Sequence, residues 1–372
     1  MIPISEPSLS ALERSYLLDA FDSGWISSLG PYVERAEIAL KGIARSDHAA
    51  LVSNGTTALH LALIATDIGP GDEVIIPALT YAATLNAVLY VGATPVIVDV
   101  RPDTWCIDVA AVESAITSRT RAIIPVDLYG QPADYRGLTK AVEGKAIVVI
   151  ADAAESIGAT LAGRPAGSLA DISTFSFFGN KVVTSGEGGA ITTNDAALDA
   201  RVRRLRNQGN HPDIRYMHDM LGYNYRMTNL SAAVLTAQLE RLPELLARRL
   251  AVLGSYNELL GANKHFRIQQ RPSDVVASPW MFSLEIANAS SAQRDRVMDD
   301  MRKSGVETRP VFRLMQDMPY FTSTVAVDTP VAQRLSEAGI SLPTFPGLTR
   351  GQIGTVVDSL VRSVSHIHHA IE

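Results

Sequence analysis

Cysteine is almost absent from this sequence, since Cys106 is the single one among 372 residues. No disulfide can therefore form within the chain, which excludes the disulfide-stapled class of small secreted proteins. A lone thiol is typical of a protein that works in a reducing compartment, so we expect a cytoplasmic protein.

Long apolar runs and a strong charge of either sign are lacking as well. No apolar segment approaches the roughly 20 residues that a membrane-spanning helix needs. The first ten residues, MIPISEPSLS, show neither the basic nor the apolar region of a signal peptide. The net charge of −6 gives no reason to expect a polyanion as partner. We therefore expect neither nucleic-acid nor membrane binding.

Several familiar catalytic motifs are also missing. The sequence has no G-x-S-x-G nucleophile turn and no G-x-x-x-x-G-K-[ST] phosphate loop. His211 and His218 lack a second ligand pair at metal-binding spacing, and the remaining candidates lie in a helical segment near the end: His366, His368 and His369. We expect no bound metal.

What the sequence does have is ample core material, with 47% hydrophobic residues, arranged in an alternating pattern. From about residue 48 to 195, helical segments such as YAATLNAVLYVG separate strand-like runs: DEVIIPAL, TPVIVDV, RAIIPVDLYG, KAIVVIADAAE and ISTFSFFG. Nearly continuous apolar strands between helices predict a parallel sheet covered on both faces. Ligands of such sheets bind at the carboxyl ends of the strands.

The pattern changes towards the C-terminus. A long helical stretch begins at MTNLSAAVLTAQLERL, and Pro243 is placed to kink or divide it. WMFSLEIA then predicts a strand, while SAQRDRVMDDMRKSG and GQIGTVVDSLVRSVSHIHHAI predict amphipathic helices. We predict a large α/β domain over residues 1–240 and a smaller α+β domain over residues 241–372.

Three short segments could carry chemistry. In the first, LVSNGTTALHLALIA, a strand turns into a helix at Gly55 and Thr56, where free N–H groups can bind an anion. In the second, VVIADAAES, Asp152 ends a strand, and Glu155 follows in the same turn. Taken alone, each segment is better explained by ordinary helix capping.

The third segment, FSFFGNKVVTSGEGG, places Lys181 between an aromatic run and a glycine-rich turn. A lysine with an apolar environment forms Schiff bases readily, although most lysines only extend their ammonium group into solvent. Taken together, the three segments supply a phosphate-binding helix start, a carboxylate for a pyridinium nitrogen and an imine-forming lysine. Those are the groups that hold pyridoxal 5′-phosphate.

The chain resembles the DegT-type nucleotide-sugar aminotransferases, which are pyridoxal-phosphate enzymes with the aspartate-aminotransferase fold (fold type I). The resemblance runs almost end to end, through segments such as SGWISSLGPYVERAE, SNGTTALHLAL, IIPVDLYGQPAD, LADISTFSFFGNKVVTSGEGG, GYNYRMTNLSAAVL and ISLPTFPGLT. Within that family the chain looks most like the enzymes that make GDP-perosamine.

The resemblance implies a role for each matching residue. Lys181 forms the Schiff base and moves the proton, Asp152 pairs with the pyridine nitrogen, and Glu155 lies near the ring hydroxyl. The remaining contacts to the cofactor come from one ring-stacking residue, Tyr81, and from the phosphate-binding residues Gly55, Thr56 and Ser176.

The resemblance also implies partners. Asn224 reaches the phosphate of the neighbouring subunit, which makes the active unit a homodimer, and Trp25, Arg226 and Arg309 contact the sugar nucleotide. L-Glutamate donates its amino group to GDP-4-keto-6-deoxymannose, a reaction of lipopolysaccharide O-antigen synthesis. A dTDP- or UDP-linked keto sugar aminated at C4 or C3, a keto-sugar dehydratase and a non-catalytic regulator are the alternatives.

The chain departs from the family pattern in three places, the first of which borders the expected substrate site. Where many members have a Pro followed by a His after ETRP, this chain has Leu314 and Gln316. Ala151 replaces a commoner acidic residue, and the position of Glu155 is a histidine or glutamine in many relatives. The dehydratases of this family carry histidine in place of Lys181, so the lysine argues against that alternative.

Overall fold

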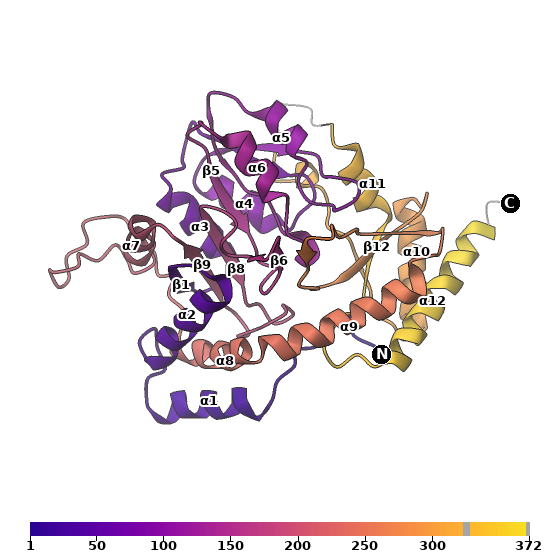
Figure 1. Cartoon of the computed structure of the whole chain (residues 1–372), viewed down its shortest axis with the longest axis horizontal. Coiled ribbons are helices and arrows are strands. Elements are labelled where there is room, and N and C mark those ends of the chain that lie inside the picture. Colours follow the sequence, from indigo (N-terminus) through magenta and orange to yellow (C-terminus); the bar gives the residue numbers. More distant parts are fainter. Residues whose placement is uncertain (323–327, 370–372) are drawn as a thin grey trace.

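The computed structural model describes residues 1–322 and 328–369. Its largest sheet has seven strands in the order β1-β9-β8-β5-β4-β2-β3. Figure 1 labels four of them, β1, β9, β8 and β5. Only β9 runs against the others, since it pairs antiparallel with both β1 and β8 while the remaining neighbours are parallel. The strands are β1 His48–Val52, β2 Glu73–Pro77, β3 Thr94–Val98, β4 Thr120–Ile123, β5 Val148–Asp152, β8 Ile172–Ser176 and β9 Gly189–Thr193. The mixed, mostly parallel sheet expected from the sequence is confirmed.

Helices cover this sheet because its strands are buried on both faces, as the fully buried EVIIP of β2 shows. Helix α3 packs against β8 and β9, while α1 and α2 pack against α8. The helices of this region are α1 Ala11–Asp22, α2 Pro31–Ala44, α3 Gly55–Ala65, α4 Ala82–Tyr90, α5 Val109–Ala115, α6 Tyr135–Val142, α7 Ala196–Leu205 and α8 Asn229–Glu240.

The C-terminal part has its own antiparallel sheet in the order β10-β12-β14-β13. Its elements are β10 Phe266–Ile268, β12 Phe282–Ile286, β13 Arg309–Pro310, β14 Gly339–Leu342, α9 Leu242–Leu260, α10 Ser291–Lys303, α11 Pro330–Ala338 and α12 Arg350–His369. A third small sheet joins the two regions, because β11 Val275–Val276 pairs with β6 Thr160–Leu161, which pairs with β7 Arg164–Pro165.

The long helical stretch predicted around Pro243 is two helices, α8 and α9, that meet at Arg241. Proline lies in the first turn of α9, where its missing N–H would have no intrahelical acceptor. Buried side chains form two clusters that divide within α9: Leu245 belongs to the first and Val252 to the second. The domain boundary near residue 240 stays a prediction.

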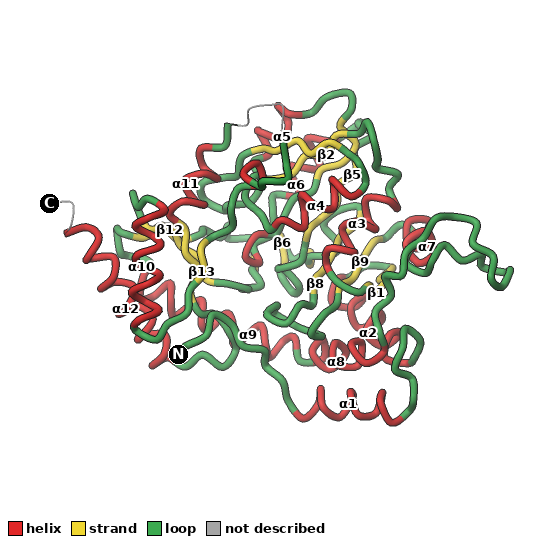
Figure 2. Tube along the Cα trace, turned by 180° about the vertical axis from the view of Figure 1, so that it is seen from behind, coloured by secondary structure: helices red, strands yellow, loops and turns green. Residues whose placement is uncertain are grey.

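The segment between α7 and α8 forms an arm, residues 207–224, that extends away from the body of the molecule (Figures 1 and 2). Large apolar side chains of the arm lie in solvent, with Tyr216 and Leu221 each 82% exposed. Because exposed apolar groups of this size are costly in water, the arm is suited to contact another surface.

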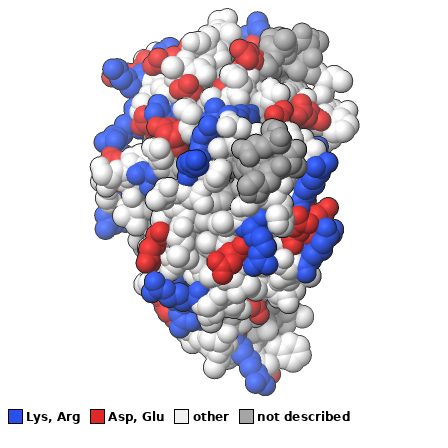
Figure 3. Space-filling model, turned by 90° about the vertical axis from the view of Figure 1, so that its right-hand side faces the viewer, with Lys and Arg blue, Asp and Glu red and all other residues white. Residues whose placement is uncertain are grey.

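Charged side chains of both signs are interspersed on the face drawn in Figure 3. On α10, Arg302 pairs with Asp299 at 2.7 Å and Lys303 pairs with Asp300 at 3.0 Å. The two charges of each exposed pair neutralise each other locally. Among the helices within residues 1–322 and 328–369, none is both long and apolar enough to cross a membrane.

Candidate active site

The three segments singled out in the sequence end at one edge of the large sheet. Strands β5 and β8 are parallel neighbours, and β1 runs in the same direction because β9 is antiparallel to both β1 and β8. Asp152 is the last residue of β5 and Ser176 the last of β8, while β1 leads into the turn before α3. The carboxyl edge of a parallel sheet is where such folds bind ligands.

Lys181 follows β8 and turns its amine inwards. Its side chain is only 12% exposed, and Nζ lies 3.6 Å from Oε1 of Glu155. The same nitrogen lies 3.8 Å from the centre of the Trp280 ring, a cation–π distance. Burial lowers the pKa of Lys181, although the carboxylates of Glu155 and Asp152 oppose that effect. The amine is therefore easier to deprotonate than an ordinary lysine.

Glu155 is buried between two donors. Its Oε2 accepts a 2.6 Å hydrogen bond from the backbone N–H of Tyr129, while Oε1 faces Lys181. Burial raises the pKa of Glu155 to about 7, against the effect of the Lys181 charge. This carboxyl can therefore gain or lose a proton near neutral pH.

Asp152 lies deeper in the same site. Its Oδ2 accepts a 2.8 Å hydrogen bond from the hydroxyl of Thr84 on α4, and Oδ1 accepts from the backbone N–H of Ala154 at 3.3 Å. Burial raises the pKa of Asp152, while the Thr84 hydrogen bond and the Lys181 charge favour its ionised form. A buried carboxylate of this kind can bind a cationic ring nitrogen.

The start of α3 presents free backbone donors. Asn54 caps the helix, because its Oδ1 accepts from the N–H of Thr57 at 2.9 Å. The N–H groups of Gly55 and Thr56 precede that bond and have no intrahelical acceptor. A Cβ on Gly55 would lie 2.8 Å from Cβ of Ser176, so glycine lets this helix start approach the end of β8. Backbone donors and the Ser176 hydroxyl thus form one anion-binding corner.

The donor set fits pyridoxal 5′-phosphate. The close approach of Gly55 to Ser176 would suit the phosphate, the carboxylate of Asp152 would suit the pyridine nitrogen, and the desolvated amine of Lys181 would suit the aldehyde. No group of three His, Cys, Asp or Glu side chains within residues 1–322 and 328–369 is placed to hold a metal ion.

Tyr81, expected to stack on the cofactor ring, is the N-cap residue of α4 and is 63% exposed. Its ring lies 5.8 Å from that of Phe312, at an angle of 55°. Phe312 in turn stacks on Tyr129 with 5.6 Å between ring centres, and Tyr129 stacks on Trp280 at 6.1 Å. An aromatic wall therefore runs from Tyr81 to the Lys181 amine.

Sequence reasoning missed Thr84 and the inner members of this wall. Thr84 stands three residues after Tyr81 on α4, so helical spacing was the signal that could have found it. Trp280 and Tyr129 carry no such signal, because the segments that hold them are distant in sequence from Lys181. Leu314, which departs from the family pattern, borders the site as well. It forms a β-bridge with Leu79, just ahead of Tyr81 in the chain.

The other predicted residues make no polar contact with the Lys181 cluster within the described part of the chain. Within the described part of this single chain, no hydrogen bond or ion pair joins the Lys181, Asp152 and Glu155 cluster to any of Trp25, Asn224, Arg226 and Arg309. Trp25 is 53% exposed, and its carbonyl accepts from Nδ2 of Asn229 at 2.7 Å. Arg309 is exposed, 3.9 Å from Glu307.

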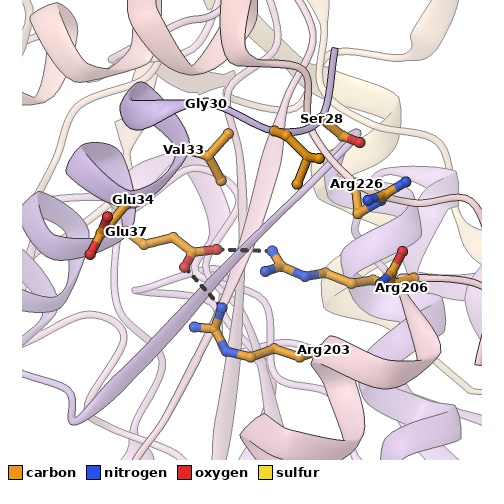
Figure 4. Close-up of a pocket in the computed structure, with 10 residues that line it drawn as sticks. Ser28, Gly30, Val33, Glu34, Glu37, Arg203, Arg206 and Arg226 are labelled. Carbon is orange, nitrogen blue, oxygen red and sulfur yellow. Dashed lines mark hydrogen bonds and ion pairs between the residues drawn. The ribbon is translucent and has the colours of Figure 1, made fainter. Parts of the chain in front are cut away.

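Arg226 instead lines a hollow of about 340 Å³ at the base of the arm (Figure 4). Its Nε is buried without a hydrogen-bond partner among the described residues. Glu37 bridges two other arginines of this hollow, lying 2.9 Å from both Arg203 and Arg206. Asn224 lies at the same base, where it forms a bridge with Asn207.

Comparison with known proteins gives relatives over nearly the whole chain. The model of the DegT/DnrJ/EryC1/StrS aminotransferase family matches residues 7–361. GDP-perosamine synthase of Caulobacter vibrioides is 45% identical over 96% of this chain and 97% of its own length. The corresponding synthase of Escherichia coli O157:H7 is 40% identical, over 96% and 97%.

A solved structure has the same fold. The putative sugar aminotransferase Spr1654 from Streptococcus pneumoniae, in its PMP form, superposes with a TM-score of 0.93 at 28% identity and covers 99% of this chain and 100% of its own. The same protein has been solved in a PLP form. The likeness thus includes proteins that carry the cofactor predicted from the three segments.

Proposed function

The chain belongs to the DegT/DnrJ/EryC1/StrS aminotransferase family, and from this premise we propose that it transfers the amino group of L-glutamate to GDP-4-keto-6-deoxy-D-mannose, making GDP-perosamine. It is a pyridoxal-phosphate-dependent aminotransferase. The observation that carries the choice of substrate is the full-length similarity to GDP-perosamine synthases of three organisms.

When bound, pyridoxal 5′-phosphate supplies an aldehyde that takes up the amino group and a ring that withdraws electrons from the reacting carbon. Lys181 is the residue of this chain that can move the proton. Its amine is desolvated, and desolvation favours the neutral form that accepts a proton. One lysine can serve both half-reactions, since it takes a proton from one carbon and returns it to another.

We assign the fixed contacts to the remaining residues. Asp152, ionised with help from Thr84, keeps the ring nitrogen protonated. Gly55, Thr56 and Ser176 hold the phosphate, and Tyr81 covers the ring face. These assignments rest on the carboxyl-edge placement of β5, β8 and α3 together with the resemblance of their sequences to the family motifs.

We further propose that the active unit is a homodimer. Helix α1 and the turn after it expose large apolar side chains, which include Leu18, Phe21, Trp25 and Ile26. The arm that ends at Asn224 exposes others, and patches of this kind mark interfaces between protein chains. In such a dimer Asn224 and Arg226 of one subunit complete the site around Lys181 of its partner, and Trp25 and Arg309 contact the nucleotide sugar.

The nucleotide-linked substrate implies a cytoplasmic reaction, and an amino sugar of this type serves lipopolysaccharide O-antigen synthesis. The test is a panel of GDP-, dTDP- and UDP-linked 4-keto-6-deoxy sugars, each incubated with the enzyme, cofactor and L-glutamate. GDP-perosamine, identified by mass and NMR, is the expected product. Preferential amination of a dTDP or UDP sugar would replace the substrate assignment, and a 3-deoxy product without nitrogen would overturn the aminotransfer itself.

A further inference from the structure

The amine of Lys181 is held between two groups, the ring face of Trp280 at 3.8 Å and the carboxyl of Glu155 at 3.6 Å. We propose that Lys181 and Glu155 share one proton, and that Glu155 accepts it whenever the lysine must act as a neutral base. The inference rests on the proposed aminotransfer, because Lys181 can take a substrate proton only in its neutral form, and Glu155 holds the extra proton of the ammonium at those times.

The position of Glu155 is fixed from one side only. Its Oε2 is occupied by the N–H of Tyr129, a residue whose backbone lies in the left-handed region with φ of 56°. The next residue, Gly130, has φ of 84°, and a Cβ there would lie 1.7 Å from the carbonyl oxygen of Ser278. This turn therefore cannot easily relax, and it leaves Oε1 of Glu155 directed at Lys181.

Trp280 is fixed as firmly on the other side of the amine. Its Nε1 donates to the carbonyl of Asn180 at 2.9 Å, and its own carbonyl accepts from Arg249 at 2.9 Å. The indole face excludes water from that side of the amine. Because the Lys181 side chain is only 12% exposed and its Nζ lies 3.6 Å from Oε1 of Glu155, this carboxyl is a nearer proton acceptor than bulk solvent.

Burial moves the proton affinities of the two groups towards each other. Burial lowers the pKa of Lys181 and raises the pKa of Glu155 to about 7, so the two affinities for a proton approach each other. In the transfer, the Lys181 side chain closes the 3.6 Å gap to hydrogen-bond distance, an N–H bond of the ammonium breaks and an O–H bond forms on Oε1, with no other reactant. The groups that act on this pair are Asp152, Tyr129, Cys106 and the guanidinium of Arg249 at the Lys181 carbonyl.

A buried ion pair could also serve only to hold the Lys181 loop in place. The two roles differ in what Glu155→Gln changes. Glutamine keeps the size and an oxygen for the Tyr129 N–H. Loss of the carboxylate shifts the pH at which Lys181 becomes neutral in either role, because the opposite charge is removed. Only a proton acceptor also produces an acid limb of kcat that disappears in Glu155→Gln.

The first measurement uses cofactor-free protein and follows the rate of pyridoxal 5′-phosphate uptake against pH. Uptake requires a neutral amine. In Glu155→Gln the midpoint is expected to move to lower pH, because the ammonium loses its carboxylate partner. Glu155→Asp should move it less, since the carboxyl remains one methylene further away. Exposed Glu113 on α5 gives the matched control, Glu113→Gln, with the wild-type midpoint expected.

The second measurement follows kcat against pH in the cofactor-loaded enzyme. Wild type should lose activity as pH falls through about 7, where Glu155 becomes protonated and cannot accept. Glu155→Gln should lose this limb and fall at least about tenfold in kcat above it. An acid limb in Glu155→Gln equal to that of Glu113→Gln would overturn the proposal, whatever the uptake midpoint.

These readouts separate the inference from the proposed function. If no keto sugar is aminated but the uptake midpoint shifts as expected, the electrostatic coupling of Lys181 to Glu155 stands and the reaction assignment fails. If amino sugar forms at the wild-type rate in Glu155→Gln, the aminotransfer stands and the shared proton fails. Should Glu155→Gln lack a cooperative unfolding transition, Glu155→Asp decides alone, and an unshifted midpoint in that variant counts against the shared proton.

Discussion

The hydroxyl of Thr84 donates a 2.8 Å hydrogen bond to Oδ2 of Asp152, joining α4 to the end of β5. Both residues are buried, and a second hydroxyl, that of Thr80, lies 3.2 Å from the Thr84 oxygen. Burial alone would favour a neutral carboxyl at Asp152. The Thr84 hydrogen bond therefore helps to keep charged the residue on which protonation of a bound pyridine ring depends.

Thr84→Val should weaken cofactor binding. Valine keeps the shape of threonine but removes the donor, and a hydrogen bond to a charged group contributes about 1.5–3 kcal/mol. We expect the dissociation constant for pyridoxal 5′-phosphate to rise at least about tenfold, with a further rise in the pKa of Asp152. Absorbance titration at several pH values measures both. Thr80→Val, which leaves the direct bond intact, should have a smaller effect, and equal effects would contradict this role for Thr84.

Lys181→Ala should abolish the visible absorption band of the bound cofactor and all aminotransfer. The lysine is the single amine in contact with the Glu155 and Trp280 groups among the described residues, so no neighbour can replace it. Cofactor should still bind through Asp152 and the start of α3, more weakly and without a covalent link. Exposed Lys140 on α6 provides the control, and Lys140→Ala should keep the band. A band of wild-type strength in Lys181→Ala would refute the assignment.

Gly55→Ala should weaken cofactor binding, whereas Gly42→Ala should stabilise its helix. An added Cβ at Gly55 would lie 2.8 Å from Cβ of Ser176, which would push the start of α3 away from the end of β8. Cofactor affinity should fall at least about tenfold, because the phosphate donors would separate. Gly42 in α2 has no atom within 4 Å of the added Cβ. Alanine there should stabilise the helix by about 0.5–1 kcal/mol. Thermal unfolding and cofactor titration of both variants check the contrast.

The sequence predicted the parts of the site that depend on local patterns. Asp152, Ser176 and Gly55 could be found because apolar runs locate strand ends, and strand ends of a parallel sheet meet at one edge. Lys181 could be found because an aromatic run and a glycine-rich turn flank it. The fold class followed from the same alternation of strands and helices.

The surroundings of Lys181 could not be predicted in the same way. Trp280 reaches the amine from the segment before β12, about one hundred residues further along the chain. Tyr129 contributes a backbone N–H, which any residue type could supply, and its left-handed conformation is unusual for tyrosine. Contacts between distant segments depend on tertiary packing, which short-range periodicity does not report.

The low pKa of Glu13 predicts that the folded protein loses stability in acid. Burial alone would raise its pKa, but hydrogen bonds from Ser10, Arg241 and Gln238 outweigh that and lower the pKa to about 2. A carboxyl whose pKa is lower in the folded state stabilises the fold above its ordinary value of 4.5, and this contribution disappears as pH falls towards 2. Glu13→Gln should flatten the decline of unfolding free energy over that range. The exposed control Glu6→Gln should keep the wild-type slope, and a Glu13→Gln slope equal to it would contradict this role.

Two inactive variants should restore activity when their subunits are mixed. Lys181→Ala removes the proton carrier from a subunit's own site, whereas Asn224→Asp places a negative charge where its partner's phosphate is expected to bind. A mixed dimer then has one site with both changes and one site with neither, because each site takes Lys181 from one subunit and Asn224 from the other. Random re-association of equal amounts should recover about a quarter of wild-type activity.

The control for this experiment mixes Lys181→Ala with Asp152→Ala, since both residues serve the site of their own subunit. A mixed dimer of that pair has one defect in each site, so no activity should return. Recovery in the first mixture and none in the second would assign Asn224 to the partner's site. If neither mixture regains activity although mass measurement shows that mixed dimers have formed, Asn224 acts within its own subunit. The hollow at the base of the arm then serves the Lys181 site of its own chain.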